Sequence, residues 1–157
     1  MGRIVVGVDG SEGSRQALQW AANEASVHDA ELEVLYVYEH TPSWLLSLTT
    51  DEDANATTVR PTRQDREVAA REAGSQAQSL VDEMVRALDE GRVTALALEG
   101  ARPAQVLVER STGADLLVVG SRGRGGFAGL RLGSVSQQCA THATCPVVVI
   151  RSSVEVG

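Results

Sequence analysis

Apolar residues follow two patterns that alternate along the chain. Short, nearly continuous apolar runs are typical of strands buried on both faces of a sheet. Between these runs, apolar residues recur every three or four positions, which is typical of helices that bury one face. The apolar runs predict five strands, at Arg3–Val8, Glu31–Tyr38, Arg92–Glu99, Asp115–Gly120 and Pro146–Arg151.

Four helices are predicted between the strands, because capping residues and helical spacing occur together there. The first starts at an N-cap on Ser11 or Ser14 and runs to about His28, and the others cover about 64–90, Ala104–Arg110 after Pro103, and Ser134 to about His142. Gly74 is a weak point within the longest of them. Residues 41–63 are rich in Pro, Thr and Asp and predict a long, flexible connection, in which the apolar "SWLLSL" is expected to lie on another part of the chain.

The order of these elements is β-α-β-α-β-α-β-α-β. Such alternation predicts an α/β fold with an open five-stranded parallel sheet, right-handed crossovers and helices on both faces. With 157 residues, the chain is long enough for one well-packed domain and too short for two. We therefore expect a single Rossmann-like domain over residues 1–157.

The net charge and the composition of the chain exclude several classes of function. The net charge of −7 argues against non-specific nucleic-acid binding, which depends on neutralising phosphates. The chain contains no lysine, which excludes a Walker A lysine, a kinase strand lysine and Schiff-base chemistry. A single phosphorylated ligand in a locally basic loop remains compatible with this composition.

The two cysteines, Cys139 and Cys145, give no disulfide framework, and the Cys-x5-Cys spacing without a second pair is not a zinc motif. The first residues enter a strand at once, and we find no leader peptide and no long apolar run. These observations predict a reduced, cytoplasmic protein that does not bind a membrane.

Residues 118–134, "VVGSRGRGGFAGLRLGS", hold six glycines and three arginines between a strand and a helix. Glycine lets backbone N–H groups approach a ligand without interference from a Cβ. Ser134 is well placed as the N-cap of the following helix, and the free amides at a helix N-terminus bind anions. Ligands of parallel sheets bind at the carboxyl ends of the strands, so the stretch predicts a phosphate site.

Two known phosphate motifs do not explain this stretch. The P-loop motif requires the missing lysine. "GRGGFA", residues 123–128, matches a relaxed dinucleotide fingerprint, but that motif belongs early in a βαβ unit with an acidic residue about 20 positions later. Here Glu155 alone lies in that region, within the C-terminal tail.

The spacing Gly120-x2-Gly123-x9-Gly133-Ser134 resembles the G-x2-G-x9-G-[ST] motif of the ATP-binding branch of the universal stress protein family. The resemblance covers the whole chain, through "VGVDGS", "LYVYE", "EGARP" and "CPVVVIR" in the family's order. It implies the sheet order 3-2-1-4-5, in which the ends of the first and fourth strands border one crevice. It also implies ATP held with Mg²⁺ or Mn²⁺ on the phosphates, and a homodimer formed through strand 146–151.

The resemblance also assigns roles to individual residues. Asp9, after Val8 at the end of the first strand, matches the acidic residue on the adenine and ribose side, and Val37 matches a backbone contact to adenine. Ser136 matches a hydroxyl near the terminal phosphate. The phosphate segment corresponds to Gly120, Arg122, Gly123, Gly133, Ser134 and Val135.

Simpler interpretations of three features remain open at this point. Asp9 is also a favoured N-cap residue for the first helix. Arg122, Arg124 and Arg131 also suit a solvated surface. The last strand, if it lies at a sheet edge, is covered by a second copy of the chain, by a helix or by the tail that follows it.

Three functions are compatible with the chain: a nucleotide-binding regulator, an enzyme that transfers phosphoryl groups or hydrolyses ATP slowly, and an interaction module without a ligand. The complete glycine pattern disfavours the last. Residues 118–136 contain no Asp, Glu or His to orient a nucleophile, which favours a regulator over an enzyme. Cyclic AMP or another adenine nucleotide is the alternative ligand.

Overall fold

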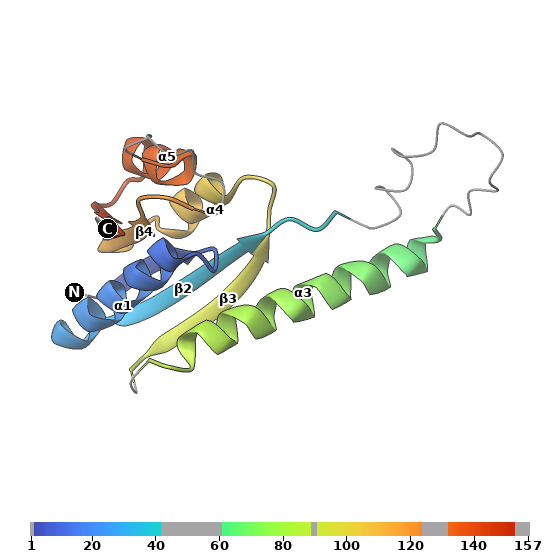
Figure 1. Cartoon of the computed structure of the whole chain (residues 1–157), viewed down its shortest axis with the longest axis horizontal. Helices are drawn as coiled ribbons and strands as arrows, with labels where there is room; N and C mark the ends of the chain where they lie inside the picture. The colour runs from blue at the N-terminus through green and yellow to red at the C-terminus, as the bar shows by residue number, and fades with distance from the viewer. Residues whose placement is uncertain (1, 42–60, 89–90, 124–131, 153–157) are drawn as a thin grey trace, which may run out of the picture.

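The structure is a computed structural model that describes residues 2–41, 61–88, 91–123 and 132–152. The chain alternates between strands and helices, as the apolar pattern predicts (Figure 1). The elements are β1 (Arg3–Val8), α1 (Glu12–Val27), β2 (Glu31–Tyr38), α3 (Arg63–Val85), β3 (Val93–Glu99), α4 (Pro103–Arg110), β4 (Leu116–Gly120), α5 (Ser134–His142) and β5 (Val147–Ile150).

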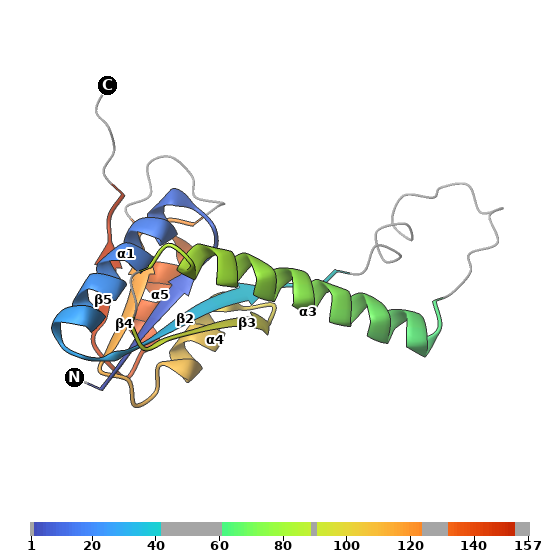
Figure 2. The same ribbon diagram turned by 90° about the horizontal axis from the view of Figure 1, so that it is seen from below.

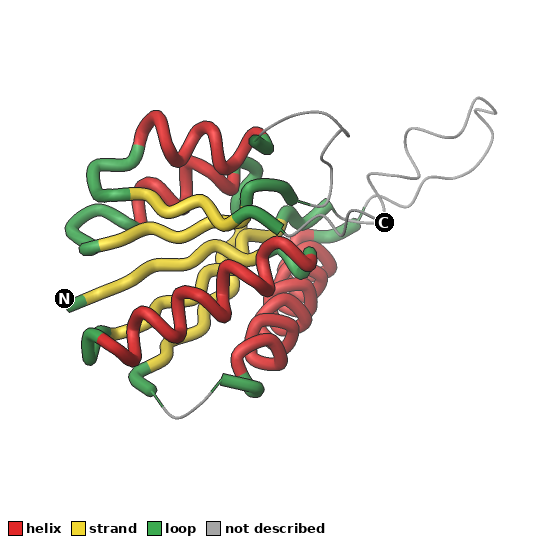
Figure 3. Tube along the Cα trace, turned by 60° about the vertical axis from the view of Figure 1, so that its left-hand side comes forward, coloured by secondary structure: helices red, strands yellow, loops and turns green. Residues whose placement is uncertain are grey.

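The five strands form one parallel sheet in the order β3-β2-β1-β4-β5. This confirms the predicted α/β class and the strand order. Figure 3 shows the sheet between two layers of helices. One apolar cluster lies between the sheet and α1 and α3, and a second lies between the sheet and α4 and α5. The order reverses between β1 and β4, which makes their carboxyl ends the switch point of the sheet.

Helix α3 differs from its predicted extent, because it ends at Val85 instead of continuing to about Glu90. Its first turns project beyond the sheet (Figures 1 and 2). Gly74 lies where the helix crosses Tyr38, and a Cβ on this glycine would lie 3.0 Å from the tyrosine Oη. The glycine therefore lets α3 pack closely on the end of β2. The predicted connection lies largely within residues 42–60, outside the described residues.

Charged side chains hold the amino ends of the strands. Glu33 of β2 is buried and forms ion pairs with Arg3 of β1, at 2.9 Å, and with Arg110 at the end of α4. Asp115 accepts hydrogen bonds from the amides of Gly2 and Arg3, at 2.7 and 2.9 Å. These amides, that of Arg3 foremost, lower the pKa of the Asp115 carboxyl. The network ties three elements together at one end of the sheet.

Candidate functional site

Asp9 follows β1 at the switch point of the sheet. Its Oδ1 accepts a hydrogen bond from the amide of Ser11 at 2.9 Å, and its own amide donates to Ser14 Oγ at 3.3 Å. The N-cap of α1 is Ser11, whose Oγ accepts from the amide of Ser14 at 3.2 Å. Asp9 therefore orders the turn before α1 but does not cap the helix.

Gly123 lies directly beside Asp9. A Cβ on Gly123 would lie 2.7 Å from Asp9 Oδ2, closer than real Cβ contacts allow. The chain leaving β4 thus passes against the carboxylate that follows β1, as expected if the two border one crevice. Only a glycine allows this approach without displacing the carboxylate.

The amino end of α5 completes this corner of the molecule. The N-cap is Gly133, so the prediction of Ser134 as the cap is wrong, and Ser134 is the first helical residue and exposed. The amide of Gly133 donates to the carbonyl of Ser121 at 2.7 Å. This bond holds the start of α5 against the residue that follows β4. No described side chain caps α5, which leaves its first amides available to an anion.

Ser136 faces the interior. Its side chain is buried, and its hydroxyl lies within donating distance of the carbonyls of Ser121, at 3.1 Å, and Gly133, at 2.9 Å. In this conformation Ser136 links Ser121 and Gly133, the residues on either side of the glycine-rich loop between β4 and α5; we call this pair the loop neck. The amide of Ser121 also donates to the carbonyl of Ile150 at 2.7 Å, so the same residue joins the loop to the end of β5.

Two glycines serve close backbone packing at this site. A Cβ on Gly120 would lie 2.9 Å from the carbonyl carbon of Gly13, and a Cβ on Gly13 would lie 3.2 Å from the carbonyl oxygen of Arg122. The first turn of α1 therefore rests on the chain that leaves β4. The sequence interpretation missed Gly13, although its position between two serines in "GSEGS" is a signal for close approach at a helix start.

Of the valines among the predicted site residues, Val8 is buried and Val37 and Val135 are half-buried. Val8 is buried in the cluster under α1, and Val135 packs against the cluster under α5. Val37 lies one position beyond the pair formed by Val8 and Tyr36, so it aligns with Asp9 along the sheet edge. Any ligand contact by the buried Val8 would come from its backbone. Arg122 is exposed at the loop, whereas residues 124–131, with the other two arginines, lie outside the described residues.

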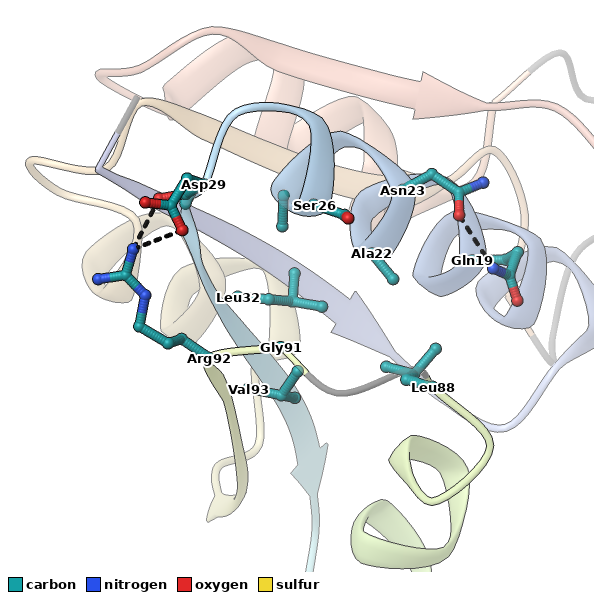
Figure 4. Close-up of a pocket in the computed structure, with 12 residues that line it drawn as sticks. Gln19, Ala22, Asn23, Ser26, Asp29, Leu32, Leu88, Gly91, Arg92 and Val93 are labelled. Carbon is teal, nitrogen blue, oxygen red and sulfur yellow. Dashed lines mark hydrogen bonds and ion pairs between the residues drawn. The ribbon is translucent and has the colours of Figure 1, made fainter.

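A concave pocket of about 520 Å³ lies elsewhere, beside the amino ends of β2 and β3 (Figure 4). Its floor is apolar, with Leu32 and Val93, and an ion pair between Asp29 and Arg92, 2.9 Å apart, closes one end. This pocket contains none of the predicted site residues. Within the described ranges, no three His, Cys, Asp or Glu side chains gather as a metal site.

The family model described as the universal stress protein family matches residues 1–151 of the chain. The chain belongs to the universal stress protein family. It is 32% identical over 150 residues to a universal stress protein of Thermus aquaticus, with 94% of this chain and 97% of that protein covered. It is also 34% identical to a universal stress protein of Mycolicibacterium smegmatis over 94% of its own length. The chain spans less than half, 45%, of that longer relative.

Solved structures of the family share the fold. The UspA protein of Lactobacillus plantarum is 27% identical, with a TM-score of 0.61 and coverage of 96% and 97% of the two chains. A universal stress protein determined in complex with cAMP is 26% identical, with a TM-score of 0.58 and 95% of each chain covered. Nucleotide binding thus occurs in at least one close structural relative.

Proposed function

We propose that the chain binds an adenine nucleotide, ATP with Mg²⁺ or Mn²⁺, at the carboxyl ends of β1 and β4. The observation that carries this proposal is the convergence of Asp9, Gly123 and the uncapped amino end of α5 at the switch point. An acidic group beside a bare backbone and helix amides suits a ligand with a ribose at one end and phosphates at the other.

The proposed roles follow the geometry of each residue. Asp9 accepts from the ribose side, the backbone of Val8 and Val37 contacts the base, and the amides of the loop and helix hold the phosphates. Ser136, already bonded to two carbonyls, keeps the loop neck closed and presents its amide. The amides in question belong to Gly120, Arg122, Gly123, Ser134, Val135 and Ser136, and Gly133, whose own amide is bonded to the carbonyl of Ser121, positions the last three. The metal ion is held chiefly through the phosphates.

The protein acts as a nucleotide-dependent regulator in a stress response, located in the cytoplasm. No residue from 118 to 136 carries a carboxylate or imidazole that could orient water for hydrolysis. Slow ATP hydrolysis, or binding of cAMP as in the structural relative, is the alternative. None of the helices in the described ranges combines the length and apolar character needed to cross a bilayer.

The outer side of β5 is proposed to pair two copies as a homodimer. The carbonyls of Pro146 and Ile150 accept hydrogen bonds from β4, so by alternation the backbone groups of Val147 and Val149 point outward. No hydrogen bond from another described segment reaches these groups. Two such edges related by a two-fold axis satisfy each other in an antiparallel pair.

Calorimetry with ATP and Mg²⁺ tests the nucleotide site. We expect the parent chain to bind and Gly123→Val to lose binding, because the added carbons occupy the space against Asp9. The control is Gly2→Val, at the opposite end of the sheet, where a Cβ makes an ordinary 3.6 Å contact with Asp115. If Gly123→Val binds ATP like the parent while circular dichroism shows both folded, the site lies elsewhere.

A further inference from the structure

The sheet has two edge strands, β3 and β5, and their outward backbone groups differ in whether a described side chain binds them. β3 pairs with β2 through alternate residues. The amide of Leu32 donates to the carbonyl of Arg92, and the amide of Gly100 donates to the carbonyl of Tyr38. The backbone groups of Ala95 and Ala97 therefore point away from the sheet. An edge of this kind is a template for an added strand.

The side chain of Gln78, from α3, occupies this outer edge. Its Nε2 donates to the carbonyl of Ala95 at 2.8 Å, and its Oε1 accepts from the amide of Ala97 at 2.9 Å. In a parallel ladder, one residue of the neighbouring strand makes these same two bonds, to residues two apart. The carboxamide of Gln78 thus stands in for the backbone of a sixth strand, opposite Leu96.

A third hydrogen bond fixes the orientation of this carboxamide. Nε2 of Gln78 also donates to Asp82 Oδ1 at 2.9 Å, one helical turn further along α3. The other hydrogen of the amide nitrogen is thereby used, so the oxygen faces the amide of Ala97. Buried faces of α3, at Ala77 and Val81, hold the helix against the sheet on either side of Gln78.

We propose that Gln78 closes β3 to strand pairing and so confines self-association to the β5 edge. Without Gln78, the outer edge of β3 could pair with the exposed strand edge of a second copy of this chain. Pairing through β5 alone closes after two copies, whereas pairing through both edges continues without limit. Confinement of self-association to β5 rests on the homodimer proposed above, whereas the closing of β3 by Gln78 depends neither on that dimer nor on nucleotide binding.

Sedimentation velocity of Gln78→Ala over a range of concentrations tests this proposal. Alanine removes both bonds to β3 and preserves helix propensity. We expect assemblies larger than those of the parent, increasing with concentration, and an amide of Ala97 that exchanges hydrogen at least about tenfold faster. The matched control is Gln105→Ala, which removes an i,i+4 bond to Glu109 on the exposed side of α4 and should sediment like the parent.

Gln78→Glu provides a second variant, because it keeps an acceptor for Ala97 but replaces the donor to Ala95 with a carboxylate oxygen. It should also form larger assemblies if the proposal holds. If both variants are folded by circular dichroism and sediment like the parent, the proposal is overturned. A monomeric parent would contradict the β5 dimer alone, because self-association of Gln78→Ala would then arise at β3.

Discussion

The two ends of the parallel strands are built in different ways. At the amino ends, charged side chains join the elements: Glu33 to Arg3 and Arg110, and Arg92 to Asp29. At the carboxyl ends of β1 and β4, backbone meets backbone and glycines allow the approach. One end is therefore joined by ion pairs, and the other is the end at which we propose that helix and loop amides bind a ligand.

This difference shows why the two ends should respond differently to substitution. A side-chain network loses stability when one charged group is removed, because its partners stay behind without compensation. A backbone site loses ligand when a Cβ is added, even where the fold tolerates the change. Three sets of substitutions measure this contrast, beginning with the largest expected effect.

Glu33→Ala should lower the free energy of unfolding by about 3 kcal/mol, near the lower limit for a broken buried ion pair. The lower limit applies because the side chains of Arg3 and Arg110 remain 31% and 44% exposed. Urea denaturation measures the loss, and ATP affinity should stay unchanged. Glu67→Ala, which breaks an exposed pair with Arg63, should change stability by less than about 1 kcal/mol. Equal effects of the two variants would show that Glu33 holds nothing together.

Gly120→Ala should destabilise the chain by about 1–3 kcal/mol, the usual cost of overpacking, because its Cβ meets the rigid backbone of Gly13. Gly123→Ala should cost less stability, since its Cβ meets the end of the Asp9 side chain, which can rotate away. Its ATP affinity should nevertheless fall. Thermal unfolding and calorimetry on both variants check the contrast, which is wrong if Gly123→Ala is the less stable of the two.

Asp115→Asn should have the smallest effect, visible in the acid range. Hydrogen bonds from the amides of Arg3 and Gly2 lower the pKa of Asp115, so the folded state binds fewer protons than the unfolded state. The stabilisation is present above the unfolded pKa, about 4, and disappears as pH falls through the lowered value. Urea midpoints from pH 6 to pH 3 should therefore fall less steeply in Asp115→Asn than in the parent. Parallel curves would assign no role to this carboxylate.

Apolar patterning predicted the sheet and its helices well, because burial on two faces leaves a direct trace in the sequence. The deviations come from local chemistry. β4 starts at Leu116, one residue after Asp115, whose side chain accepts from the amides of Gly2 and Arg3. β5 starts after Pro146, which has no amide to donate. The end of α3 was misplaced because neither glycine nor proline directly follows Val85.

The proximity of Asp9 to the segment that follows β4 was predictable from the sequence, whereas the individual contacts of the candidate site were not. Glycine spacing indicates where backbone is exposed, yet it does not distinguish a glycine that faces a ligand from one that packs on another backbone. Gly120 contacts Gly13, whereas Gly123 contacts Asp9. The inward direction of Ser136 and the bonds of Gln78 to the edge of β3 depend on tertiary packing, which residue type alone does not determine.

Ser121 has a consequence for spectroscopy. Its amide donates a hydrogen bond to the carbonyl of Ile150 in β5. Its carbonyl accepts hydrogen bonds from the amide of Gly133 and the hydroxyl of Ser136. An isotope label in this one residue would therefore carry two separate signals in a nuclear magnetic resonance spectrum. The chemical shift of the amide nitrogen would report changes at Ile150 of β5. The chemical shift of the carbonyl carbon would report changes at the start of α5, where we propose that the ligand binds.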